Sequence, residues 1–371
     1  MNTEATSLLA NLVSIDSVNP GLVAGAAGET EIAAFIRAWL TNHGIDSRIV
    51  EPAPGRPSVI AELHGEGPQL MFNGHIDTVG VTGMAEPHTP HIENGILDGR
   101  GAYDMKAGVA AGLLAIADLK STNFPGSLAL TAVADEEDTS IGTLAVLQEM
   151  RPAAAVVLEP TELQPSIAHK GFVWAKITTH GVAAHGSRRD LGVDAIGQMG
   201  TVLTRLTELD AHLEAAGHHP LLTSGSIHAS TITGGREYST YPESATLTLE
   251  RRTLPGETYD EVAAELEGLL DGLDPAASLD ITLRRPAFGI SNDAPLTRLL
   301  VQADRAMGGN LPIRGEHPWT DAALFSEAGI PAIIYGPGGF GAHADVEGVH
   351  LADVQRCRET LVDLAWRFIA S

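Results

Sequence analysis

The sequence predicts an α/β protein in which a domain built on a mostly parallel sheet is interrupted by a smaller, ferredoxin-like α/β sandwich. Strand-like and helix-like runs alternate over residues 69–158 and again after Pro286. This rhythm is typical of a parallel sheet covered by helices on both faces. Between these parts the expected order is β-α-β-β-α-β, that of a ferredoxin-like sandwich. We therefore expect a discontinuous domain of residues 1–172 and 286–371 and an inserted domain of residues 173–285.

The first α/β part opens with an amphipathic helix. Residues 29–42 place apolar side chains at the spacing of one helical face, and Gly44 follows where that helix should end. The further elements expected in this part are strands at 46–51, 57–64, 69–74, 127–133 and 154–158 and helices at 105–119 and 140–149.

The pattern changes near residue 166, where strands become half-exposed. Phe172–Thr178 alternates between apolar and polar residues, which predicts a strand with one buried face. The elements expected next are a helix at 192–215, strands at 226–233 and 244–250, a helix at 257–270 and a strand at 278–284. After Pro286 we expect helices at 294–306, 321–327 and 352–368 and strands at 312–313 and 331–335.

Composition limits the functional classes. The 371 residues are 44% hydrophobic, enough for roughly two globular domains of about 100–200 residues each. The single cysteine, Cys357, can form neither an internal disulfide nor a thiolate metal site. A formal charge of −24 opposes nucleic-acid binding. No signal peptide or apolar run of about 20 residues is evident, so we expect a cytoplasmic protein without a membrane partner.

Acidic and histidine residues follow several of the expected strands. They are His75 and Asp77 after strand 69–74, Glu136 and Glu137 after 127–133, Glu159 after 154–158, His343 after 331–335, and Asp104 at a helix start after a glycine-rich turn. In open α/β sheets, ligands bind at the carboxyl ends of the strands. A mixed set of imidazole and carboxylate ligands suits Zn²⁺, Co²⁺ or Mn²⁺ rather than Ca²⁺ or Mg²⁺.

Each of these residues also has a structural explanation. His75 could be a hydrogen-bonded buried histidine, Asp104 a helix cap, and the acidic run 135–138 a solvated loop. Two adjacent carboxylates can instead divide two tasks, one binding metal and the other taking a proton. Taken together, in this order and at these separations, the residues favour a metal site.

These motifs resemble those of the dinuclear-zinc amidohydrolase and exopeptidase family that includes acetylornithine deacetylase, succinyl-diaminopimelate desuccinylase, aminoacylase and carboxypeptidase G. The segments that carry the resemblance are Gly74–Val79, Gly99–Lys106, Asp135–Glu137, Glu159–Thr161, and Ala342-His343 with Glu347 four residues on. They occur in the family's order, and the resemblance extends over essentially the whole chain. It implies a metallopeptidase catalytic domain with an inserted dimerisation or lid domain.

The resemblance implies a site for two divalent metal ions, expected to be Zn²⁺, with Co²⁺ or Mn²⁺ as alternatives. The residues matching its roles are Asp104 as the bridge, His75 and Glu159 on one metal, Glu137 and His343 on the other, Glu136 as the general base and Asp77 as the support of His75. The base would activate a water that attacks an amide carbonyl and would return the proton to the leaving amine. A cis peptide bond between Asp104 and Met105 is also implied.

The inserted domain carries three further candidates. His185, in Gly181–Ser187, matches a histidine that reaches the partner subunit's active site, which implies a homodimer; the alternative is an exposed loop histidine. Arg252 matches an arginine that binds the substrate carboxylate; the alternative is a surface ion pair. Ser239 stands where the family often has a substrate-contacting asparagine. Further departures at Arg189, Glu250 and Trp319 concern the substrate rather than the hydrolytic centre.

The function expected is metal-dependent hydrolysis of the amide bond of a small N-acyl amino acid, as in acetylornithine deacetylase and succinyl-diaminopimelate desuccinylase. A carboxypeptidase or dipeptidase of the same family is the nearest alternative. A non-catalytic metal-binding protein on this fold is an alternative of a different class. A dinuclear phosphodiesterase would need basic phosphate contacts, and the motif loops offer only Arg100 and Lys106.

Overall fold

The computed structural model describes residues 3–371, which form two compact units. The first unit comprises the residues up to Ile167, Ile290–Arg314 and Thr320–Ser371, and the second comprises Ala168–Gly289 and Gly315–Trp319. The residues expected to form the inserted domain lie within the second unit. Helices and strands alternate through the first unit, and the second is built on an antiparallel sheet, so the predicted α/β class is confirmed.

The large sheet is parallel at its centre and antiparallel toward its edges. Its strand order is β1-β2-β6-β3-β7-β15-β8-β13, with β14 also paired to β8, and the four strands β6, β3, β7 and β15 run parallel. The bounds are β1 Asp46–Val50, β2 Ser58–Leu63, β3 Glu66–His75, β6 Gly126–Val133, β7 Ala154–Val157, β8 Ser166–His169, β13 Phe288–Gly289, β14 Arg314–Glu316 and β15 Ala332–Ile334. Consequently four neighbouring strands end at one edge.

Helices of the first unit pack on this sheet and on one another. They are α1 Thr3–Ser14, α2 Thr30–Asn42, α3 Lys106–Ser121, α4 Ile141–Glu149, α7 Pro295–Ala306, α8 Ala322–Glu327 and α9 Leu351–Ile369. Helix α3 is rich in alanine and glycine and is buried along most of its length, which lets it approach the strands closely. A Cβ at Gly108 would lie 2.0 Å from the backbone oxygen of Leu158, so only glycine fits there. This contact fixes the start of α3 beside the strand ends.

A small antiparallel sheet in the first unit joins two distant segments. Its order is β16-β17-β5-β4, with bounds β4 His91–Glu93, β5 Ile96–Asp98, β16 Gly339–Phe340 and β17 Gly348–His350. Gly348 pairs with Asp98, so the chain leading to Asp104 runs beside the chain that follows His343. These short strands, and helix α1, were not among the predicted elements.

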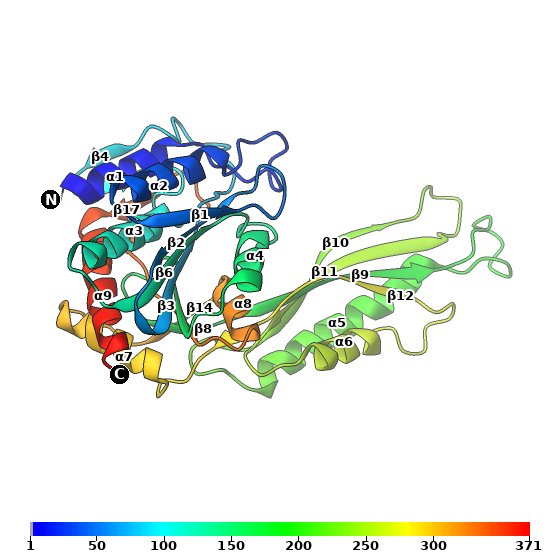
Figure 1. The fold of residues 1–371 in the computed structure, drawn as a ribbon. Coiled ribbons are helices and arrows are strands. Elements are labelled where there is room, and N and C mark those ends of the chain that lie inside the picture. The colour runs from blue at the N-terminus through cyan, green and yellow to red at the C-terminus, as the bar shows by residue number, and fades with distance from the viewer. Residues whose placement is uncertain (1–2) are drawn as a thin grey trace. The chain divides into compact units, whose positions relative to one another are not determined.

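The second unit has the strand order expected of a ferredoxin-like sandwich. Its sheet runs β10-β11-β9-β12, with all pairs antiparallel. Helices α5 Ala195–Ala216 and α6 Tyr259–Gly268 lie side by side on one face (Figure 1). The strands are β9 Gly171–His180, β10 Ser226–Gly234, β11 Ser244–Thr253 and β12 Ser278–Arg285. Every second residue of β11 is buried, which agrees with the predicted alternation.

Among the described residues, no helix combines the length and the apolar character needed to span a membrane.

Candidate metal centre

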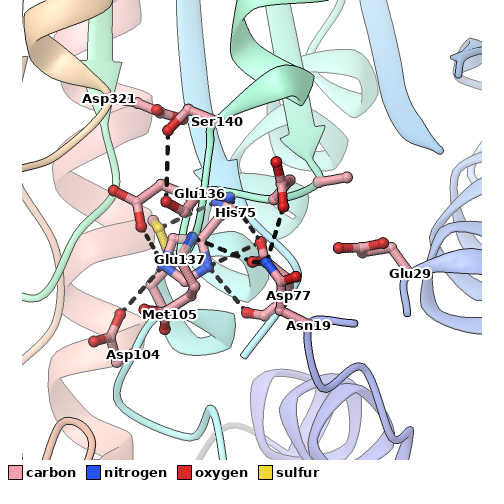
Figure 2. A network of polar contacts seen from close by, with 12 residues as sticks. Asn19, Glu29, His75, Asp77, Asp104, Met105, Glu136, Glu137, Ser140 and Asp321 are labelled. Atoms are coloured by element: carbon pink, nitrogen blue, oxygen red, sulfur yellow. Dashed lines mark hydrogen bonds and ion pairs between the residues drawn. The ribbon is translucent and has the colours of Figure 1, made fainter. Parts of the chain in front are cut away.

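The predicted metal ligands gather at the carboxyl ends of the parallel strands. His75 is the last residue of β3, Glu137 follows β6, Glu159 follows β7, and His343 lies beyond β15. Asp104 comes from the loop before α3. Because neighbouring parallel strands end at one edge, residues far apart in sequence meet there. Figure 2 shows Asp104, His75, Glu136 and Glu137 turned toward a common point.

The side chains form two donor groups that share Asp104. His75, Asp104 and Glu159 form one group, and Asp104, Glu137 and His343 form the other, with the ligand atoms of each group within 4.8 Å of one another. Asp104 Oδ1 lies 3.3 Å from His75 Nε2, and Asp104 Oδ2 lies 3.4 Å from His343 Nε2. The two oxygens of one carboxylate therefore face two different histidines.

Glu136 lies beside the donor groups without belonging to either. Its Oε2 is 3.9 Å from His75 Nε2, and its side chain is 10% exposed. Glu137, the next residue, places Oε2 3.0 Å from His343 Nε2. The adjacent carboxylates thus have different surroundings, as their expected division of tasks requires.

Asp77 holds the backbone of this acidic pair. Its Oδ1 accepts a hydrogen bond from the N–H of Glu136 at 3.1 Å, and its Oδ2 accepts one from the N–H of Glu137 at 3.2 Å. The ring of His75 approaches the backbone oxygen of Asp77 at 3.0 Å, closer than the Asp77 carboxylate at 3.6 Å. Asp77 therefore contacts both His75 and the Glu136–Glu137 backbone.

A network of buried polar residues that the sequence analysis missed supports Asp77. Asn19 Nδ2 donates to Asp77 Oδ2 at 2.7 Å and to Asp135 Oδ1 at 3.1 Å (Figure 2). Arg56 donates to Asp135 at 2.6 Å and to both carboxylate oxygens of Glu29 at 2.7 and 2.8 Å. Asn19 and Arg56 lie in loops, where no periodicity or motif marks them.

Several carboxylates of the centre are buried close together, and their negative charges repel one another. Burial, followed by the charge of Glu159, raises the pKa of Glu136 well above its ordinary value. Burial likewise raises the pKa values of Glu137 and Glu159. Hydrogen bonds to Asp104 and Glu137 raise the pKa of His343 to about 10. Divalent cations among these carboxylates would relieve the repulsion, so the donor set fits metal binding.

His75 and Asp104 show the matching effect of opposite charges. Burial opposes the charged form of His75, but the carboxylates around it, Glu159 first, outweigh burial and hold its pKa well above the ordinary value. Burial would raise the pKa of Asp104, but its contacts with His343 and His75 outweigh burial and lower it. The peptide bond between Asp104 and Met105 is cis, as the resemblance implied.

The remaining candidates, His185, Ser239 and Arg252, belong to the second unit. His185 is exposed, and its Nδ1 lies 2.8 Å from the Ser187 hydroxyl. The backbone oxygen of Ser239 accepts a hydrogen bond from Gly186 at 2.7 Å, so Ser239 lies beside the His185 loop. Arg252 is half-buried and donates through Nε to Glu250 at 2.7 Å.

The chain belongs to the peptidase family M20/M25/M40, whose family model matches residues 71–367. It is therefore a hydrolase of that family, and the predicted family is confirmed.

Similar proteins share this chain over nearly its full length. N-formyl-4-amino-5-aminomethyl-2-methylpyrimidine deformylase of Bacillus subtilis (strain 168) is 28% identical, over 98% of this chain and 94% of that protein. The deformylase of the same name from Halalkalibacterium halodurans is 26% identical over the same shares.

Two solved structures show the same fold. The aminopeptidase PepT of Bacillus cereus superposes with a TM-score of 0.82 at 18% identity, over 98% of this chain and 97% of that chain. The YXEP protein of Bacillus subtilis, a dinuclear metal binding peptidase from the M20 family, has a TM-score of 0.77 at 16% identity, over 99% and 98% of the two chains.

Proposed function

We propose that this chain is a metal-dependent hydrolase that cleaves the amide bond of a small N-acyl compound. The observation that carries the proposal is the arrangement of Asp104 and Glu136. Asp104 presents one oxygen to the histidine of each donor group, and Glu136 lies 3.9 Å from His75 as a largely buried carboxylate that belongs to neither group. This is the arrangement that a two-metal hydrolase with a separate general base requires.

The two donor groups would hold two divalent ions. Imidazole and carboxylate donors suit Zn²⁺, with Co²⁺ and Mn²⁺ as alternatives. When bound, such ions supply Lewis acidity, which makes water easier to deprotonate and stabilises the negative charge that develops on a carbonyl oxygen. A second M20 protein, YXEP, is a dinuclear metal binding peptidase, which supports the same stoichiometry here.

The chain's own residues would move the proton. Glu136 takes a proton from the attacking water and returns it to the leaving amine. Burial favours this role because it raises the pKa of Glu136, so that its carboxylate binds a proton more readily than an exposed glutamate. Asp77 keeps the base in place through its hydrogen bonds to the Glu136 and Glu137 backbone.

His185 and Arg252 of one chain would act at the metal centres of two different subunits. Arg252 pairs with Phe172 at the start of β9, whereas His185 comes five residues after His180, the last residue of that strand. At about 3.3 Å per residue, the eight steps from Phe172 to His180 span about 26 Å, farther than a small substrate extends. If both groups act on one substrate, they come from two copies of the chain. This separation supports the proposed homodimer, in which His185 serves the partner subunit's centre.

Arg252 is arranged to bind an anionic group. Its Nε is held by Glu250, and its guanidinium lies over the ring of Phe172, 5.1 Å from the centroid. These two contacts orient the terminal nitrogens of the Arg252 guanidinium, and two parallel N–H groups in this arrangement suit the two oxygens of a carboxylate. The substrate proposed first is therefore an N-acyl amino acid, with Ser239 near the acting histidine; a carboxypeptidase or dipeptidase substrate would use the same contacts.

A second candidate is the deformylation of an N-formylated aminomethyl heteroaromatic compound. It is favoured by the two pyrimidine deformylases that match this chain over nearly its whole length. Both candidates use the same metal centre and differ in the leaving amine.

The cytoplasmic location expected from composition remains a prediction.

A hydrolysis screen separates the candidates. Metal-reconstituted protein would be assayed with N-formyl, N-acetyl and N-succinyl amino acids, dipeptides and an N-formyl aminomethylpyrimidine. Turnover of the amino-acid derivatives supports the first candidate, and selective turnover of the pyrimidine supports the second. A protein that binds two metal ions but hydrolyses none of these amides would instead favour a non-catalytic metal-binding role.

A further inference from the structure

The loop that carries Asp104 depends on one distant residue for its backbone hydrogen bonds. Residues 99–104 lie between β5 and α3 and belong to no helix or strand. Four of their six N–H groups donate to Glu347. The bonds are Gly99 to its backbone oxygen at 3.1 Å, Gly101 to Oε2 at 3.0 Å, and Tyr103 and Asp104 to Oε1 at 2.9 and 3.0 Å. Buried N–H groups without acceptors are costly, so this loop conformation requires Glu347.

Arg100 extends this contact to the segment that carries His343. Its Nη1 donates to Glu347 Oε2 at 2.6 Å, and its Nη2 donates to the backbone oxygen of Ala344 at 3.1 Å. Arg100 is 2% exposed and Glu347 is 1% exposed. The pair therefore connects the Asp104 loop to the residue next to His343. The bond between Arg100 and Glu347 is buried, where water does not compete for it, and the bond to Ala344 is partly buried.

We infer that Glu347 and Arg100 are positioning residues that preset the donor group of Asp104, Glu137 and His343 for its metal ion. The inference rests on the proposed metal-dependent function. Neither residue belongs to either donor group, so each would act through the placement of Asp104 and His343.

The effect should fall mainly on the donor group that contains His343. His75 is the last residue of β3 and is fully enclosed, with Asp77 beside its ring. His343 lies outside any helix or strand, has a positive φ of 62°, and its side chain is 56% exposed. The position of His343 thus depends more strongly on the contacts of its own loop.

Glu347→Gln tests the inference without changing the size of the side chain. Each carboxylate oxygen of Glu347 accepts two hydrogen bonds from nitrogen donors. An amide can present an acceptor to only one pair of donors, and its NH₂ group would face the other pair. The loop must then shift to find new acceptors.

The measurement is a titration of metal-free protein with Co²⁺, followed by absorption spectroscopy and calorimetry. Wild-type protein should bind two equivalents. Glu347→Gln should keep one binding step and lose about 10–100-fold in affinity in the other, the usual effect of removing an outer-shell contact. Arg100→Lys should weaken the same step less, because it retains the charge but not the fork.

A matched control is Asp304→Asn. Asp304 is a buried carboxylate of the same unit that accepts hydrogen bonds from Tyr335 at 2.9 Å and Arg356 at 3.0 Å and belongs to neither donor group. This variant should lower the melting temperature and leave both Co²⁺ affinities unchanged. Circular dichroism establishes that each variant is folded; if Glu347→Gln is not, Arg100→Lys and Glu347→Asp carry the test.

A double variant identifies the affected donor group. If the pair acts through His343, then adding Glu347→Gln to His343→Ala should weaken the second step no further. Unchanged affinities in the Glu347 and Arg100 variants would overturn the inference, and so would equal weakening of both steps. Wild-type protein that binds no divalent ion would instead overturn the proposed function itself.

Discussion

Replacing Glu136 with glutamine should remove the general base and leave metal binding intact. The amide has nearly the same shape as the carboxylate but cannot take a proton from water at neutral pH. Glu136 belongs to neither donor group, and its backbone N–H still donates to Asp77 in the variant. The change is therefore confined to proton transfer.

The size of the effect follows from what surrounds Glu136. General acid–base catalysis contributes about 10²–10⁴-fold to a rate, which corresponds to about 2.7–5.4 kcal/mol of activation free energy. The neighbouring carboxylates of Asp104, Glu137 and Glu159 all belong to donor groups, so none is free to replace the base. The Glu136 side chain is 10% exposed, which limits replacement by bulk water. We therefore expect a loss in kcat toward the upper end, about 10³–10⁴-fold.

The assay compares Glu136→Gln with Glu137→Gln, measuring kcat with the best substrate from the screen and metal content on the same purified samples. Glu136→Gln should keep two metal ions and lose activity. Glu137→Gln removes the carboxylate that lies 3.0 Å from His343 and should lose metal instead. The reasoning is refuted if Glu136→Gln keeps kcat within tenfold of wild type, or if it loses metal to the same extent as Glu137→Gln.

Four further predictions concern the metal, pH, the dimer and the polar network. A strong chelator should abolish hydrolysis, and Zn²⁺ or Co²⁺ should restore it; full activity in verified metal-free protein would exclude the mechanism. Folding raises the pKa values of Glu159 and His343, so the metal-free native state binds more protons than the unfolded state, and its melting temperature should fall from pH 5.5 to pH 8. Added Zn²⁺ should raise the melting temperature more at pH 8 than at pH 5.5, and a flat pH dependence in chelator would contradict this. Mixing His185→Ala with Glu136→Gln subunits should partly restore activity, whereas subunit exchange without recovery would rule out action across a dimer. Arg56→Met should lower the free energy of unfolding by about 3–5 kcal/mol, because two buried carboxylates lose their partner; denaturant unfolding measures this, and a change below about 1 kcal/mol would contradict it.

Local patterns in the sequence were sufficient to predict the main elements and to show that acidic and histidine residues follow the strands of the large sheet. The strands that end at His75 and before Glu137 and Glu159 are apolar runs followed at once by polar residues. That pattern is typical of a buried parallel strand with a functional residue at its end, and it depends only on neighbours in sequence. The ferredoxin-like arrangement of the second unit was predicted from the β-α-β-β-α-β order of its elements along the chain.

The short strands and the polar contacts of loops could not be predicted in this way. Strands β4, β5 and β17 have three residues each, too few to show a period. The contacts of Arg56 could not be predicted either, because its partners Glu29 and Asp135 are 27 and 79 residues away in the sequence. A single charged residue in a loop carries no signal of what it will contact once the chain has folded.

The sequence by itself determined which residue types stand at the strand ends, and therefore the kind of chemistry this protein can perform. Only the tertiary structure decided how they are held. In the folded chain the Glu347 carboxylate accepts hydrogen bonds from the N–H groups of Gly101 and Asp104, 246 and 243 residues away. The Asp77 carboxylate accepts one from the N–H of Glu136. The physical reason is that a buried carboxylate binds whichever donors packing brings within reach, and packing is a property of the whole fold.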